Sequence, residues 1–251
     1  MHAGEAVDAL PLQHKGASTR GWEALRAHGA AALGSVLFRW ACFLVMTWMA
    51  LWAEARPAPH LPDALVDAVP YVPWVDRLNY VAWVLAYVPV ALGLLWRDAP
   101  RFTRYMVTAG LLALVRGACI MATGLGPVRG QDVNAGMDAA TRLMAFLEIA
   151  SPVGVFGRDS AHVYLTKDLF FSGHTATTFL LLLYAWREPR LRWPMLVGHG
   201  VVVASVFLSH LHYTIDVVGA YAITFSLFVL REGNVRGMLG LPPVSGSVRR
   251  P

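Results

Sequence analysis

The chain has 251 residues, of which 56% are apolar and 15% are charged, and its formal net charge is +5 at pH 7. Soluble domains carry about 25% charged residues, so this composition is typical of a membrane protein. The basic residues stand in short stretches between apolar runs and form no aromatic-interleaved patch, so we expect no nucleic-acid partner. The two cysteines, Cys42 and Cys119, lie inside apolar runs, which argues against a disulfide framework or a zinc site.

Six apolar runs dominate the sequence, and each approaches the ~20 residues that a helix needs to cross the hydrocarbon core. The runs lie at residues 34–53, 79–96, 104–124, 170–186, 194–210 and 212–230. The first is long enough to span, so we expect a retained helix rather than a cleaved signal peptide. We therefore predict an all-α, polytopic membrane protein that forms a six-transmembrane-helix bundle.

The chain divides into three predicted parts. Residues 1–32 form a cytoplasmic N-terminal segment, residues 33–231 the six-helix transmembrane catalytic domain, and residues 232–251 a cytoplasmic tail. Ser18 or Thr19 could cap a short helix in the first part, although a surface-lying or poorly ordered leader is the favoured interpretation.

Orientation follows from the lysines and arginines. Of the 21 in the chain, thirteen fall on one side of a six-span bundle and six on the other. The positive-inside rule then places both termini in the cytoplasm. The fourth and sixth runs start on the opposite side, so groups at their beginnings face the exterior, periplasmic or lumenal, side of the membrane.

The two outer connections differ in character. Residues 125–169 form the longest one, and the apolar spacing between 137 and 149 predicts a short amphipathic helix near the interface. Pro127 and Pro152 mark turns at its two ends. A connection this long is often functional, as a lid or a substrate rim. The other connection, near 57–74, is rich in proline and aromatic residues and reads as a stiff interfacial segment.

Two short stretches, residues 167–175 and 210–216, carry the chemistry. Each opens an apolar run, so each is expected at the mouth of a helix. His212 and Asp216 are spaced i,i+4, which places both on one helical face. A carboxylate there can hold one ring nitrogen protonated and leave the other as a nucleophile or base. With His174 at a second helix mouth, the set could move a phosphoryl group.

The histidines are expected to have different tasks. His174 has Thr177 and Thr178, not an acid, at i+3 and i+4, so it suits proton transfer better than covalent catalysis. His210 is out of phase with His212, and we interpret it as a turn or rim residue.

Five further residues are expected to bind substrate. Arg116 lies inside the third run, where a charge costs several kcal/mol unless it faces a polar cavity or an anion, and a guanidinium grips phosphate well. The alternative is an arginine paired with an acid for packing. Ser172 is a fair N-cap, and Gly173 would let a substrate approach free backbone amides. Asp168 could orient the nearby histidine or bind a cationic headgroup, or be an ordinary loop acid. Tyr213, within the second stretch, is also expected to bind substrate.

These motifs resemble those of the sphingomyelin synthase family, within the wider superfamily of type 2 phosphatidic acid phosphatases and lipid phosphotransferases. The resemblance rests on Asp168-Leu-Phe-Phe-Ser-Gly-His174-Thr, on His212-Tyr-Thr-Ile-Asp216, and on Arg116-Gly117 followed by Thr123 and Pro127. It covers roughly residues 104–230. The wider superfamily's Lys-x6-Arg-Pro motif is missing, which favours the synthase-like branch. Thr166-Lys167-Asp168 stands where those synthases usually have Cys-Gly-Asp.

The resemblance implies a metal-independent ping-pong transfer without a cofactor. His212, oriented by Asp216, would attack the phosphorus of phosphatidylcholine or phosphatidylethanolamine while His174 protonates the departing diacylglycerol oxygen. A ceramide or diglyceride hydroxyl, or water, would then resolve the phosphohistidine. Arg116 would offset the phosphoryl charge. A metal held by the three histidines of the two stretches and Asp216 is the alternative, and a homo-oligomer is left open.

Two other functions are compatible with the sequence. A lipid phosphatase or phospholipase C would share every group above and take water as the acceptor. A non-catalytic membrane scaffold or transporter would need none of them, and intact histidine motifs argue against it.

Overall fold

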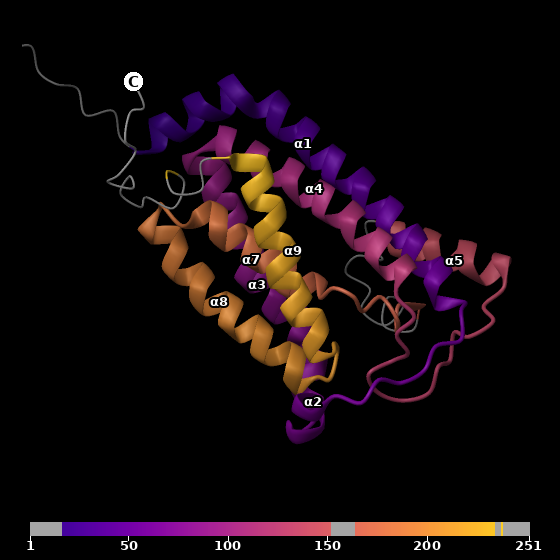
Figure 1. Cartoon of the computed structure of the whole chain (residues 1–251). Coiled ribbons are helices and arrows are strands. Elements are labelled where there is room, and N and C mark those ends of the chain that lie inside the picture. Colours follow the sequence, from indigo (N-terminus) through magenta and orange to yellow (C-terminus); the bar gives the residue numbers. More distant parts are fainter. Residues whose placement is uncertain (1–16, 152–163, 234–236, 238–251) are drawn as a thin grey trace, which may run out of the picture.

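The computed structural model describes residues 17–151, 164–233 and 237 (Figure 1). The elements in these ranges are helices, and no strand occurs among the described residues. They are α1 (Ala17–Glu54), α2 (Ala64–Ala68), α3 (Pro73–Arg97), α4 (Ala99–Ala122), α5 (Ala139–Ala150), α7 (Gly173–Ala185), α8 (Pro189–Leu208) and α9 (Thr214–Glu232). The predicted all-α class is confirmed. Most of the predicted tail and half of the predicted N-terminal segment lie outside the described residues, as does the turn at Pro152.

Five helices are long and apolar enough to cross a membrane, judged by length and composition: α1 from Arg26 onward, α3, α4, α8 and α9. The fourth predicted run forms α7, which has 13 residues and is therefore shorter than a spanning helix. Its first three residues, 170–172, precede the helix. Because α7 is largely buried, it forms an interior element that α3, α4, α8 and α9 contact. The sixth span stays a prediction.

The first helix is longer than its apolar run. It begins at Ala17 and extends for 38 residues, so the segment before residue 34 continues the helix. Alanine-rich sequence favours this continuation, since alanine has the highest helix propensity. Near its start, Trp22 contacts Trp96 of α3 edge to face, with ring centroids 5.3 Å apart.

Two glycines of α4 allow close contact with α1, which runs alongside it in Figure 1. A Cβ on Gly110 would lie 2.9 Å from the Phe38 ring, and one on Gly117 would lie 3.2 Å from the Cα of Met46. Both distances are shorter than ordinary van der Waals contact. These glycines therefore set how closely α4, which carries Arg116, lies against α1.

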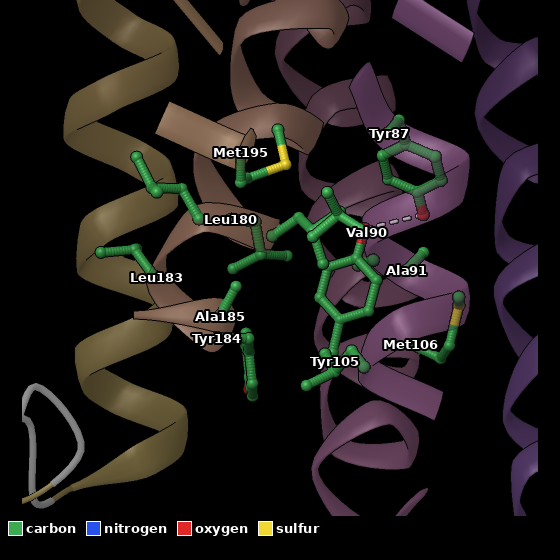
Figure 2. Close-up of a cluster of buried hydrophobic side chains, with 14 of the residues drawn as sticks. Tyr87, Val90, Ala91, Tyr105, Met106, Leu180, Leu183, Tyr184, Ala185 and Met195 are labelled. Atoms are coloured by element: carbon green, nitrogen blue, oxygen red, sulfur yellow. Dashed lines mark hydrogen bonds between the residues drawn. The ribbon is translucent and has the colours of Figure 1, made fainter. Parts of the chain in front are cut away.

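The main core joins α3, α4, α7, α8 and α9, with one residue from α1 (Figure 2). Three tyrosines provide its polar contacts. The Tyr105 hydroxyl donates to the Tyr87 hydroxyl at 2.7 Å, and the hydroxyls of Tyr184 and Thr108 are 2.8 Å apart. Since buried hydroxyls need partners, these pairs fix the positions of α3, α4 and α7 relative to one another.

The two connections predicted to lie outside each contain a short helix, α2 and α5. The predicted amphipathic helix within 125–169 is α5, capped by Asp138 and lying against α1. The Arg142 guanidinium lies 3.9 Å from the centre of the Trp52 ring. His210 occupies the turn between α8 and α9 with φ at +49°, and its Nε2 is 2.9 Å from the Val69 carbonyl oxygen. The interpretation of His210 as a turn residue is confirmed.

The glycine contacts predict a stability difference. Replacing Gly110 and Gly117 together by alanine should lower the unfolding temperature of the purified protein in detergent. Overpacking costs about 1–3 kcal/mol per site, more than the gain of about 1 kcal/mol in helix propensity.

The matched control is the double replacement of Gly29 and Gly34 in α1, where an added Cβ meets nothing within 4 Å. This variant should unfold at or above the wild-type temperature. Equal unfolding temperatures for the two double variants would show that the α1–α4 contact is looser than described.

Candidate active site

The first histidine stands in the opening turn of α7. Ser172 is the N-cap, and its Oγ accepts a hydrogen bond from the Thr175 N–H at 3.4 Å. Gly173 and His174 are then the first two helical residues. The prediction of Ser172 as an N-cap is confirmed, and the helix dipole favours negative charge at this end.

The second histidine stands just before α9. His212 precedes the N-cap residue Tyr213 and therefore lies before the helix. The prediction that His212 and Asp216 share one helical face is wrong. Its Nδ1 nevertheless lies 3.4 Å from Asp216 Oδ2, without the geometry of a hydrogen bond. Asp216 is fully buried, and its Oδ2 accepts the Tyr213 N–H at 2.9 Å. The predicted pairing therefore occurs, but the chain turn ahead of α9 produces it.

The two histidine segments are joined directly. The Ser172 N–H donates to the backbone carbonyl of Asp216 at 3.0 Å. One turn further along α9, a Cβ on Gly219 would lie 2.7 Å from the Phe170 ring, so the glycine makes room for this aromatic side chain in its present position. As a result the His174 and His212 ring centroids are 6.4 Å apart at an interplanar angle of 63°. The structure brings together the two groups that the sequence separates by 38 positions.

Arg116 holds the segment that leads into α7. The side chain is buried, and its Nε donates to the Phe171 carbonyl at 2.6 Å. One terminal nitrogen bonds to the Asp168 carbonyl and lies 3.2 Å from its carboxylate; the other lies 3.5 Å from Met46 Sδ. The guanidinium thus satisfies backbone groups that would otherwise lack partners. Pairing with an acid, the packing alternative, accounts for one of these contacts.

Gly173 and Asp168 both contact this guanidinium. A Cβ on Gly173 would lie 3.2 Å from Arg116 Cζ and Nε, so the glycine makes room for the arginine at this point. The sequence predicted that it would make room for a substrate. The Asp168 carboxylate, predicted to face His174 or a headgroup, is 26% exposed and pairs with Arg116.

Tyr213 lies in the protein interior and not on an open surface. It is fully buried, and its hydroxyl donates to the Gly126 carbonyl at 3.1 Å and accepts the Leu61 N–H at 3.0 Å. His60 Nδ1 lies 3.2 Å from the same hydroxyl. This surrounding fits a residue that anchors the second motif and differs from the substrate contact that the sequence predicted.

Asp63 is a site-supporting residue that the sequence reasoning missed. Its carboxylate accepts the Thr214 N–H at 2.5 Å and the Thr214 hydroxyl at 2.8 Å, while it also caps α2. The proline-rich connection between α1 and α3 therefore clamps the start of α9, two residues after His212. An aspartate directly before a short apolar stretch is an N-cap signal, but its second partner lies 151 positions away.

The Asp63 carboxylate stays charged over a wide pH range because its pKa is lowered. Burial raises its pKa, but the hydrogen bonds from Thr214, and then from Val66 and Leu65, outweigh burial and lower the pKa below its usual value. A lowered pKa in the folded state adds stability above the ordinary aspartate pKa. That stability is lost only as the pH falls through the lowered value.

Glu54 was also missed. This fully buried residue ends α1, and its carboxylate accepts hydrogen bonds from the Lys167 N–H, from the Thr166 hydroxyl at 2.9 Å and from the Asn134 amide at 3.0 Å. Lys167 in turn donates through Nζ to Asp132 at 2.6 Å. These contacts fix the residues that stand in place of the synthases' usual Cys-Gly-Asp. An acid at the end of an apolar run was the available signal.

Comparison with known proteins places these features in a family context. The family model described as PAP2 superfamily C-terminal matches residues 167–232, which include both histidine motifs. Sphingomyelin synthase-related protein 1 from Mus musculus is 26% identical over 202 residues, covering 77% of this chain and 42% of the relative. Phosphatidylcholine:ceramide cholinephosphotransferase 2 from Homo sapiens is 29% identical over 185 residues, covering 68% and 49%.

A third relative, phosphatidylcholine:ceramide cholinephosphotransferase 1 from Homo sapiens, is 28% identical over 209 residues, covering 76% of this chain and 50% of its own length. The chain thus spans about half the length of the curated relatives it matches. Together with the five apolar helices, the relatives support a multi-pass membrane protein. The resemblance of this chain to the sphingomyelin synthase family, within the PAP2 superfamily, is confirmed.

Proposed function

We propose that this protein is an integral-membrane lipid phosphotransferase. It would move a phospho-headgroup from phosphatidylcholine or phosphatidylethanolamine to the hydroxyl of a ceramide or a diglyceride through a phosphohistidine. The observation that carries the proposal is the approach of His174 and His212, whose ring centroids are 6.4 Å apart, with Asp216 beside the second ring. The relatives' names support a sphingolipid and phospholipid reaction.

In the first half-reaction, His212 is the nucleophile. Its Nδ1 faces Asp216, so Nε2 is the nitrogen left to attack phosphorus. A new N–P bond forms as the P–O bond to diacylglycerol breaks, and His174 donates its proton to the departing oxygen. The buried carboxylate stabilises the positive charge that develops on the His212 ring.

In the second half-reaction, the acceptor hydroxyl loses its proton to His174 and forms an O–P bond as the N–P bond breaks. Both histidines return to their starting states, so no cofactor and no metal ion takes part in the proposed cycle. When water is the acceptor, the same steps give a lipid phosphatase or a phospholipase C.

Arg116 and the start of α7 are proposed to receive the phosphoryl oxygens. One terminal nitrogen of Arg116 donates to the thioether of Met46, which is a weak acceptor that a phosphoryl oxygen could replace. The backbone N–H groups near Ser172 and Gly173 add a helix N-terminus, which favours an anion. Asp168 would keep the guanidinium oriented, and Tyr213 would hold the second motif.

The enzyme proposal is preferred over a scaffold or transporter because of where the polar groups lie. His212 and Asp216 are both buried, with exposed fractions of 4% and 0%. Burying an imidazole beside a carboxylate is costly, and such pairs cluster at functional sites. A scaffold would need neither group.

For topology, we propose six spans with both termini in the cytoplasm and the site on the exterior face, with α7 completing the fourth crossing. The charge distribution supports this orientation, with thirteen Lys and Arg on the inner side and six outside. Membrane phospholipid is the donor partner, and a homo-oligomer is compatible with this arrangement.

Because His212 is the proposed nucleophile and His174 the proposed proton donor, their replacement should affect two substrates differently. With natural phospholipid, His212→Ala and His174→Ala should each lower turnover by about 10²-fold or more. With a nitrophenyl phosphodiester, whose leaving group needs little protonation, His174→Ala should retain far more activity than His212→Ala. Asp216→Asn should act like a weaker His212→Ala on both substrates.

Initial rates of the purified variants in mixed micelles measure this difference. His60→Ala is no suitable control because His60 contacts the Tyr213 hydroxyl in the second motif. His28→Ala in α1, outside the site, serves instead and should match wild type. If His174→Ala abolishes both reactions while His212→Ala spares the activated substrate, the two roles are reversed.

The orientation predicts which side of the membrane a label can reach. A cysteine introduced at Ser247, in the predicted tail, should stay unlabelled by an impermeant maleimide in intact cells and react once the cells are opened. Labelling of intact cells would rule out a cytoplasmic C-terminus. The two native cysteines are replaced by alanine in every protein tested, and the parent without added cysteine is the control.

A further inference from the structure

The His174 ring has an aromatic neighbour on α3 that the proposed reaction does not use. Trp83 meets His174 edge to face, with ring centroids 6.0 Å apart and an interplanar angle of 76°. Its indole Nε1–H donates to the Thr177 hydroxyl at 3.1 Å. Trp83 therefore contacts the histidine itself and the next turn of the same helix.

The Thr177 hydroxyl links this contact to the backbone around the histidine. Its Oγ donates to the Gly173 carbonyl at 2.8 Å while it accepts the indole N–H. The carbonyl group it binds lies at the first residue of α7, directly before His174. A displacement of Trp83 would thus disturb both the ring and the backbone that carries it.

Trp83 is itself held by an aromatic stack on one face of α3. Its ring stacks on Tyr87 with centroids 4.9 Å apart and planes 7° apart, and on Tyr80 one turn the other way at 5.9 Å. Tyr87 belongs to the main core and accepts the Tyr105 hydroxyl of α4 (Figure 2). The stack connects the rigid interior of the bundle to the imidazole.

We propose that Trp83 is a positioning residue for His174, fixing the direction in which the imidazole delivers its proton to the leaving lipid oxygen. Trp83 contacts the His174 ring from a neighbouring helix and binds the next turn of α7, so it can fix the ring's orientation. Aromatic pairs of this geometry contribute about 0.5–1.5 kcal/mol, and small misplacements of a reacting group lower rates steeply. This inference rests on the proposed role of His174 as the proton donor.

The test compares Trp83→Phe with wild type on two substrates, natural phospholipid and nitrophenyl phosphodiester. Turnover of the natural lipid should fall about tenfold, because protonation of its leaving group depends on the position of His174. Turnover of the activated substrate should change less than about twofold. Trp74→Phe, the same change on the same helix at a residue 66% exposed, should match wild type on both.

Two further variants separate positioning from packing. Thr177→Val keeps the side-chain volume and removes the acceptor of the indole N–H. Turnover of the natural lipid should therefore fall by less than about tenfold, and turnover of the activated substrate should change little. This variant decides the matter if Trp83→Phe does not fold. In a His174→Ala background, Trp83→Phe should cause no further loss, because the two residues act through one group.

Each outcome has one meaning. Equal losses on both substrates, no loss on either, or a further loss in the His174→Ala background would overturn the positioning role and leave the proposed reaction intact. If His174→Ala itself affects both substrates equally, the proton-donor role fails and the inference fails with it.

Discussion

The hydrogen bonds of the Arg116 guanidinium are the contacts on which the rest of the site depends. The residues before α7 are not helical, so their backbone carbonyls need partners inside the bundle. Arg116 supplies partners at Asp168 and Phe171. With that segment held, the Ser172 N–H reaches the Asp216 carbonyl, and this bond brings the two histidine segments side by side. A guanidinium placed in a membrane helix at high energetic cost thereby acquires a structural task beside the proposed electrostatic one.

The two histidines are held by different parts of the fold. His174 lies in α7, which the other helices enclose, and it meets an aromatic stack that reaches the core. His212 precedes α9 in a turn, so its position depends on the outer connection through Asp63 and Tyr213. The nucleophile and the proton donor of the proposed reaction are therefore held in place by separate contacts. Changes in the outer connection should act mainly on the nucleophile, and changes in α3 mainly on the proton donor.

Local spacing made much of this predictable. The Ser172 cap, the His212–Asp216 pair and α5 all depend on residues within a few positions of one another, where sequence patterns are informative. The clamp at Asp63 and the Trp83 contact join residues 151 and 91 positions apart, and a single sequence does not encode such distances visibly. The shortness of α7 was also missed, because hydropathy counts Phe170 and Phe171 as helix although they precede the cap.

The central claim is covalent catalysis by His212, and isolation of the intermediate tests it most directly. The purified protein is mixed with phosphatidylcholine labelled at phosphorus, quenched in alkali, which preserves phosphohistidine, and digested for mass spectrometry. The account predicts a phosphocholine group on His212 in a peptide that also contains Asp216, and none in the His212→Ala protein. A label on His174, or steady turnover without any labelled peptide, would contradict it.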